Sequence, residues 1–228
     1  MRNVVLSIVD KGYFYLSDDL IRLLADNDCR FVEKVVPKLV LHRSSGDGHD
    51  PGSMLRIIGE SIWDRPNCFE MAEKVWQIVL SSNAKYPGIT YPRVLDAFIS
   101  GSIENHADTI VSWLIAHSIV DGKLDDCFAD AGMNLPLESR LEYVVGLCEA
   151  GLDPEELRRI PFLLTHRGLS WSGSEVPIIV KRIKIVDNVI SLLPGVQYVE
   201  HRKVLKGKKR ELEKHRDQVE LREFINAQ

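Results

Sequence analysis

The sequence predicts an all-α protein of stacked antiparallel helix pairs, an irregular helical repeat that ends in a long charged helix. Apolar residues recur at intervals of three and four over most of the chain, and the period-two alternation of a half-buried strand is hard to find. The helical segments are separated by short breaks that contain Gly or Pro, with no sign of alternating strands and helices. A chain of 228 residues with 45% hydrophobic content can also bury a substantial core.

The first clear helix begins at Ser17. Its hydroxyl can accept a hydrogen bond from the first turn, and Asp18 and Asp19 suit the positive end of the helix dipole. The leucines that follow form one apolar stripe, and we expect the helix to end near Asn27.

The next two segments are separated by a loop. Residues 29–42 keep helical spacing, although we expect Pro37 to kink or divide the helix, and residues 43–53 have the composition of an exposed loop. Ser53 predicts the cap of a helix, and Pro66 introduces a longer one that pairs with it. The residues expected to face inward on this longer helix are Phe69, Ala72, Val75, Trp76 and Val79.

Residues 105–120 are apolar almost all round, which predicts a central, buried helix with Gly122 at its C-terminal end. Farther on, Asp153 suits a cap and Pro154 the first helical position. The other helices predicted in this part of the chain cover roughly residues 93–101, 124–131, 136–151 and 153–168.

Two interpretations stay open for Ile178–Ile185, because its β-branched residues also suit a strand. We favour a helix, since Pro177 fits a first turn. The spacing of 3.6 that supports the helix is kept by Val180, Ile183, Lys184 and Asp187.

Overall we divide the chain into an N-terminal helical segment and loop, a helical-repeat core and a charged C-terminal helix, which cover residues 1–52, 53–195 and 196–228.

An internal similarity supports the repeat. Residues 72–80 align with residues 107–115 at an offset of 35, and both segments place apolar residues at matching positions. With the rhythm of helix, break and helix, residues 53–170 resemble irregular repeats of the HEAT or armadillo kind. The resemblance implies stacked helix pairs that offer a groove to a partner.

Motifs for catalysis, cofactors and metals are absent from the sequence. The separations of 39, 59 and 21 residues between the cysteines fit no zinc or redox motif. The cysteines are Cys29, Cys68, Cys127 and Cys148. One combination of residues suggests a metal site, namely His42 and His49 with Asp47 or Asp50. We favour a flexible loop without a metal for this segment. We therefore expect no catalytic residue, no cofactor and no metal.

The sequence also bears on compartment. No uninterrupted apolar run approaches the roughly 18 to 20 residues of a membrane span, and the N-terminus lacks the features of a signal peptide. Reduced cysteines and these absences predict a cytoplasmic protein that makes no membrane contact.

Positive charge is concentrated near the C-terminus. The chain as a whole carries a net charge of −4, whereas residues 202–228 contain nine Lys or Arg against five Asp or Glu. Residues 202–216 alone hold eight basic residues and two Glu. Three interpretations stay open for this segment: a solvated helix, a helix that docks on a protein, and a nucleic-acid contact. The candidate binding residues are Lys203, Lys206, Lys208, Lys209, Arg210 and Trp171.

We expect a non-enzymatic interaction module or scaffold that binds a protein partner. The alternative is a nucleic-acid-binding protein that uses residues 202–216. Residues 61–76 are similar to a repeat of the HEAT-like alkylpurine DNA glycosylases. This resemblance implies a DNA glycosylase as a more specific version of the alternative. That resemblance implies an acidic residue, for which Asp108 near Trp113 is the candidate.

Overall fold

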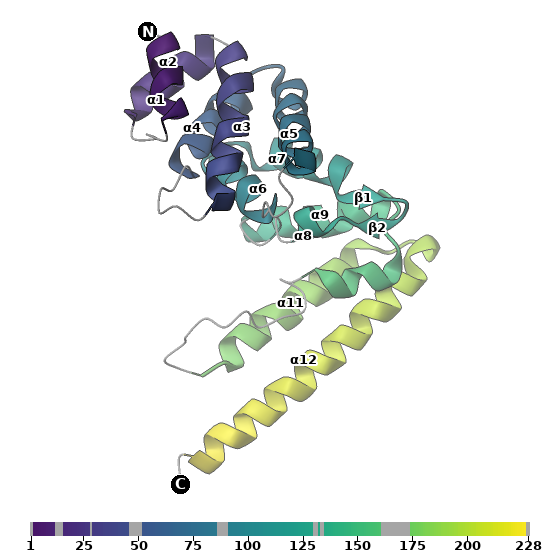
Figure 1. Ribbon diagram of the computed structural model, residues 1–228. Helices are drawn as coiled ribbons and strands as arrows, with labels where there is room; N and C mark the ends of the chain where they lie inside the picture. The colour runs from purple at the N-terminus through teal and green to yellow at the C-terminus, as the bar shows by residue number, and fades with distance from the viewer. Residues whose placement is uncertain are drawn as a thin grey trace. The chain divides into compact units, whose positions relative to one another are not determined.

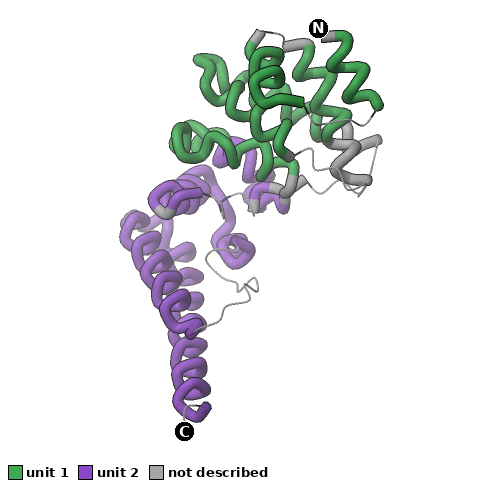
Figure 2. Tube along the Cα trace, turned by 90° about the vertical axis from the view of Figure 1, so that its left-hand side faces the viewer, with its two compact units in different colours: residues 1–113 green, residues 114–228 purple. Residues whose placement is uncertain are grey.

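The chain is all-α in the computed structural model, which confirms the predicted fold class (Figure 1). The described residues are 2–11, 16–27, 29–45, 52–85, 91–129, 132, 135–160 and 174–226. Contacts divide the chain into two compact units, residues 1–113 and residues 114–228 (Figure 2). The three-part division expected from the sequence stays a prediction.

Unit 1 is built around helix α4, which packs on α2, α3, α5 and α6, while α3 also packs on α1 and α5. No helix was predicted for the segment that forms α1. The helices are α1 (Arg2–Asp10), α2 (Asp18–Asn27), α3 (Cys29–Ser45), α4 (Gly52–Trp63), α5 (Cys68–Lys85), α6 (Tyr91–Ser100) and α7 (Ile103–Ser118), of which α7 continues into unit 2.

The start of α2 is the one predicted, because the Leu20 amide donates to the Ser17 hydroxyl at 3.3 Å. Its end at Asn27 is confirmed as well. The predicted cap of α4 is wrong, since the helix begins at Gly52 and Ser53 therefore lies inside its first turn.

Helix α3 runs undivided through Pro37 to Ser45, so division by proline is wrong and a kink at Pro37 is not tested. The predicted loop is wrong for residues 43–45, which are helical, and residues 46–51 lie outside the described residues. Proline removes one backbone donor. The helix persists because Val35, Val36 and Leu39 around it are fully buried, and tertiary packing outweighs the missing hydrogen bond.

Four aromatic side chains form the centre of unit 1. The ring centroid of Trp113 lies 5.8 Å from that of Trp63 and 6.3 Å from that of Trp76, both in edge-on geometry. Phe98 completes the cluster, 5.6 Å from Trp63. Of the residues predicted to face inward on α5, Phe69 is the exception, because 44% of it is exposed.

Gly59 lets α4 approach α6 closely. A Cβ at this position would lie 2.0 Å from the carbonyl oxygen of Phe98, a distance that no side chain tolerates. The glycine therefore sets the separation of the two helices that carry Trp63 and Phe98.

Unit 2 contains a β-hairpin that the sequence analysis did not predict. Helix α7 ends at Ser118 and leads into β1 (Ile119–Val120) and antiparallel β2 (Lys123–Leu124). Gly122 is therefore a turn residue and not the stop of a helix, as had been expected. Asp121 and Gly122 have φ values of 51° and 79°, the positive values that a two-residue type I′ turn requires.

The expected burial of α7 is confirmed for one face only. Ile110, Val111 and Trp113 are buried, whereas Asp108 and Ser112 are exposed. A helix whose sequence is apolar nearly all round thus still keeps a polar face in solvent.

The remaining elements of unit 2 follow the hairpin. They are α8 (Asp126–Ala129), α9 (Leu137–Glu149), η2 (Pro154–Arg159), α11 (Val176–Leu192), η3 (Val196–Tyr198) and α12 (Val199–Asn226). Pro154 begins its element as predicted, but η2 is a short 3-10 helix, and Asp153 makes no side-chain capping hydrogen bond. The end of the predicted helix, residues 161–168, lies outside the described residues.

Helices α11 and α12 pack along each other in unit 2. Residues 178–185 are helical, so the preferred interpretation is confirmed and the strand is wrong. Leu205, Leu212 and Val219 recur every seven residues on α12 and are all buried. We call these three residues the inner seam of α12.

Arg202 and His201 fix the beginning of α12. The Arg202 guanidinium donates to the carbonyl oxygens of Leu193 and Gly195, the latter at 2.6 Å, and so satisfies acceptors left free where α11 ends. His201 is buried, and its Nε2 lies 2.7 Å from the carbonyl oxygen of Leu152.

The repeat itself stays a prediction. The alignment places Val75 on Ile110 and Trp76 on Val111, and all four are buried, but no further feature tests the relationship.

Within the described ranges, no helix has the length and apolar character that crossing a membrane requires.

Candidate interaction surface on the C-terminal helix

The basic candidate residues all lie on α12, within unit 2. Lys203, Lys206 and Arg210 are exposed, and Lys208 and Lys209 are partly covered. Trp171 lies outside the described residues, so its proposed role as a partner anchor stays a prediction.

Three of the candidate lysines form ion pairs. Lys203 donates to Glu200 at 3.1 Å and Lys208 to Glu211 at 2.7 Å, each three residues apart on the same helix. These two lysines are partly neutralised by their own helix.

Lys209 reaches across to α11, where its Nζ lies 2.8 and 2.7 Å from the two carboxylate oxygens of Asp187. This hydrogen bond, followed by the charges of Asp187 and Glu213, raises the pKa of Lys209. The pair joins the two helices, which makes Lys209 a structural residue of unit 2 more than a ligand-binding one.

Three further cations of α12 form a row along the helix. Lys206, Arg210 and Lys214 are exposed and follow one another at intervals of four, and none of them has an ion-pair partner among the described residues. At about 1.5 Å per residue, neighbouring charges are about 6 Å apart along the axis. We call these three residues the basic stripe.

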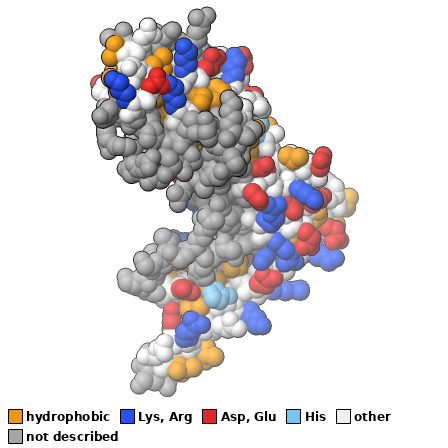
Figure 3. Space-filling model, viewed as in Figure 1, with side chains coloured by type: hydrophobic (Ala, Val, Ile, Leu, Met, Phe, Trp, Pro, Cys, Tyr) orange, Lys and Arg blue, Asp and Glu red, His pale blue; other side chains and the backbone are white. Residues whose placement is uncertain are grey.

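An apolar group follows the basic stripe toward the C-terminus, and the exposed Asp217, which pairs with Arg216, lies between them on the same side of the helix. Leu221, Phe224 and Ile225 are 60%, 62% and 62% exposed, and their spacing of three and four places them on one turn. We call them the apolar turn. Figure 3 shows hydrophobic side chains near this end of α12 and mixed charges farther along the helix.

The basic stripe and the apolar turn share one side of α12. At about 100° per residue, both groups centre on a direction roughly opposite to the inner seam. The inner seam packs inside unit 2, so the opposite side is left to solvent. We call the basic stripe and the apolar turn together the outward face of α12.

The apolar turn was not among the candidate sites predicted from the sequence. The signal that identifies it is a change of register, because Leu221 follows Val219 by only two residues and so lies about 200° away around the helix. Apolar residues that leave an established heptad register point to a second surface.

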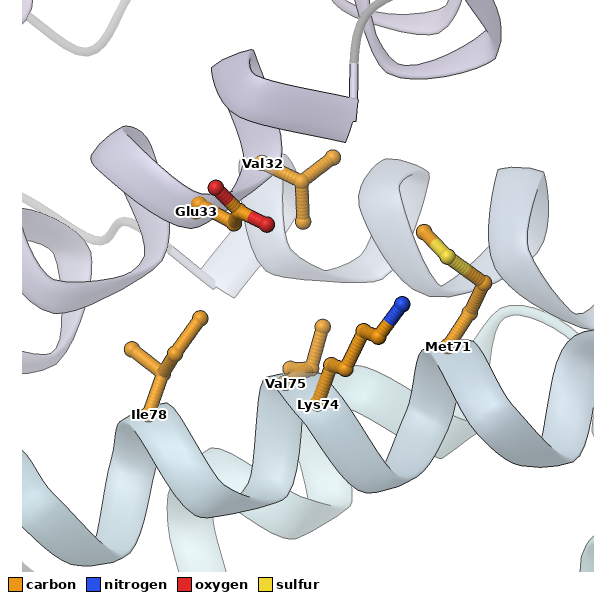
Figure 4. Close-up of a pocket in the computed structure, with 6 residues that line it drawn as sticks. All are labelled: Val32, Glu33, Met71, Lys74, Val75 and Ile78. Atoms are coloured by element: carbon orange, nitrogen blue, oxygen red, sulfur yellow. The ribbon is translucent and has the colours of Figure 1, made fainter.

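A small groove lies between α3 and α5 (Figure 4). Its cavity of about 20 Å³ has room for about one water molecule. Lys74 at its edge is paired with Glu70 at 2.8 Å. The lining residues are Val32, Glu33, Met71, Lys74, Val75 and Ile78. This groove is too small for an organic substrate.

The residues suggested by resemblance to the glycosylases do not form a base-binding site among the described residues. Trp113 is fully buried in the aromatic cluster, so its ring is not available to stack on a nucleobase. Asp108 is exposed on the other side of α7.

Within the described ranges, no group of three His, Cys, Asp or Glu residues could hold a metal ion. His42 lies on α3, whereas His49, Asp47 and Asp50 lie outside those ranges, so the suggested metal site is not tested.

Two buried groups have pKa values that make them unreactive. Desolvation, with a further contribution from the charge of Glu149, raises the pKa of the Cys148 thiol from 9.0 to about 12. Burial likewise raises the pKa of Tyr143, whose hydroxyl lies 2.7 Å from that of Ser118 and donates to the carbonyl oxygen of Phe128. Both groups stay protonated and serve packing.

We expect Cys148 to resist alkylation in the folded protein. A raised pKa removes the thiolate that attacks the reagent, so reaction with iodoacetamide near pH 8 should be at least about a hundredfold slower than in denaturant. The rate is measured by mass spectrometry on a variant in which Cys29, Cys68 and Cys127 are alanine. Equal rates in buffer and denaturant would contradict the assignment.

A comparison of the chain with protein-family models, curated proteins and solved structures finds no match.

Proposed function

We propose that this chain is a non-enzymatic helical module that binds a protein partner through the outward face of α12. The observation that carries the proposal is the apolar turn: three large side chains, each about 60% exposed, stand side by side opposite the inner seam. Burying such a side chain contributes about 1.5 to 3 kcal/mol, and a contiguous exposed apolar group is typical of an interaction site.

The rest of α12 supports the proposal. The inner seam and the Lys209–Asp187 pair anchor the helix on unit 2, so the outward face is held in a fixed orientation. A surface that is rigid before binding loses less conformational entropy when a partner docks. The basic stripe beside the apolar turn adds a charged rim to an apolar centre, the usual anatomy of an interface.

Site-specific photo-crosslinking tests this function. Phe224 is replaced with benzoylphenylalanine in cells that express the protein, and Phe69 on α5, which is 44% exposed, is replaced in the matched control. We expect a discrete cross-linked protein from position 224 that is missing from position 69, and its purified form should bind the purified chain. Only background cross-linking at position 224, or the same products from both positions, would refute the proposal.

A second candidate function, nucleic-acid binding, is favoured by the basic stripe alone. Three cations that have no carboxylate partner within the described ranges can neutralise about three phosphates, which predicts that log K falls with log salt with a slope of about −2 to −3. Anisotropy with labelled duplex DNA or RNA measures this slope.

The matched variants for this measurement each remove three charges. One carries K206Q, R210Q and K214Q, and the other carries K181Q, K184Q and R222Q at exposed cations outside the stripe. Nucleic-acid binding through the stripe requires that the first variant, and not the second, flatten the salt dependence. Equal slopes for wild type and the first variant would eliminate this candidate.

A further inference from the structure

We infer that the partner segment is an acidic amphipathic helix that lies along the outward face of α12. This inference rests on the proposed docking function and names the chemistry of what docks. It follows from the charge of the basic stripe, from the position of the apolar turn, and from the backbone chemistry of a helical surface.

The basic stripe selects for negative charge. Lys206, Arg210 and Lys214 are exposed and have no carboxylate partner among the described residues, whereas their neighbours Lys203, Lys208 and Lys209 are already paired. Their repeat of about 6 Å matches carboxylates at intervals of four on another helix. A neutral or basic segment would leave three like charges uncompensated beneath it.

The apolar turn fixes the second half of the partner. From Lys206 to Ile225 the outward face extends about 28 Å along the axis, the length of a helix of about 20 residues. Such a segment carries acidic residues over one half of one face. Over the other half it carries apolar residues at intervals of three and four, which pack on Leu221, Phe224 and Ile225.

Backbone chemistry favours a helix over an extended peptide. The N–H and C=O groups of α12 are used inside the helix, so its surface offers no ladder to which a strand could be added. An extended segment buried on the apolar turn would therefore leave its own backbone groups without partners. A helix satisfies them internally.

Other occupants fit the charge pattern less well. Two copies of α12 side by side in parallel would place one basic stripe against the other, and in antiparallel they would place it against the partner's apolar turn. A nucleic acid would find one exposed aromatic ring, Phe224, on this face. A membrane-surface helix needs an apolar face along its whole length, whereas this one has a single turn.

Binding of designed peptides to the full chain tests the inference. The probe is a fluorescein-labelled helical peptide of 21 residues with three Glu at intervals of four, followed by Leu, Leu and Ile on the next turns of the same face. A second peptide carries the apolar turn at the opposite end, so that parallel and antiparallel docking are both sampled. The matched control peptides carry Lys in place of the Glu residues.

Anisotropy near 50 mM salt should show one of the Glu peptides binding about tenfold tighter than its Lys counterpart. The charge-reversed variant K206E/R210E/K214E should invert this preference, and L221D/F224D should weaken both peptides. The control variant K181E/K184E, which reverses two exposed charges on α11 and leaves the outward face of α12 in place, should keep the wild-type preference.

Three results would each overturn the inference: no Glu preference in wild type, no inversion by charge reversal, or tighter binding of duplex DNA or of vesicles with about 30% anionic lipid. Self-association through this face, seen by light scattering and abolished by L221D/F224D, would also overturn it. Failure here is distinguishable from failure of the docking function. A partner cross-linked at position 224 that is not an acidic helix keeps the function and removes only this inference.

Discussion

Replacing Trp113 with alanine is expected to lower the free energy of unfolding by about 3 to 5 kcal/mol. The indole is fully buried and contacts Trp63, Trp76 and Phe98, so its removal leaves a cavity where three other helices meet. The remaining rings cannot close this space without moving their helices, and edge-on ring contacts are lost as well. Urea denaturation followed by circular dichroism measures the change.

The matched control for this prediction is Leu80→Ala on α5. Leu80 is 37% exposed, and its truncation should change the free energy of unfolding by no more than about 1 kcal/mol. A loss at Trp113 as small as the loss at Leu80 would show that the aromatic cluster is not the centre of unit 1.

Leu205→Asp is expected to cost at least about 4 kcal/mol in the free energy of unfolding. Leu205 is fully buried in the inner seam, where α12 packs on α11 and on η2. The substitution removes a packed side chain and places a carboxylate at a fully buried position, where its desolvation is costly. We expect α12 to separate from unit 2, with a loss of helical signal and faster hydrogen exchange along the segment.

The same chemical change on the outward face is the control. Leu221→Asp lies on the same helix at a position that is 60% exposed, and it should change stability by only about 0.5 kcal/mol while weakening partner binding. Equal destabilisation by the two substitutions would mean that α12 has no distinct inner and outer sides.

Much of this fold could be predicted from local sequence. The spacing of apolar residues predicts most of the helices, and Ser17 and the acidic residues after it predict the start of α2. The heptad of Leu205, Leu212 and Val219, which form the buried side of α12, is a pattern of the same local kind. These features depend on residues within one or two turns of each other.

The features that were missed have two different causes. The hairpin at Asp121-Gly122 was available in the sequence, since this dipeptide is a strong signal for a type I′ turn, but the apolar run before it suggested only a helix and its end. The continuity of α3 through Pro37 was not available, because it depends on burial by other helices.

For the candidate site, sequence could identify the basic segment but not sort its members. Lys209 pairs with Asp187, which is 22 residues away, so its role depends on how α11 packs against α12. Lys206 and Arg210 lie in the same basic segment as Lys209, yet neither has an ion-pair partner among the described residues. Which cations remain available is a property of the folded surface.

Hydroxyl-radical footprinting of the unmodified chain tests the central claim most directly, because it compares leucines of one helix that differ only in the side they occupy. Our account predicts that Leu221 is oxidised several-fold faster than Leu205 and Leu212, with Phe224 and Ile225 also reactive. Similar oxidation rates for the three leucines, or faster oxidation of Leu205 and Leu212, would contradict a helix that packs through its heptad and presents its other side to a partner.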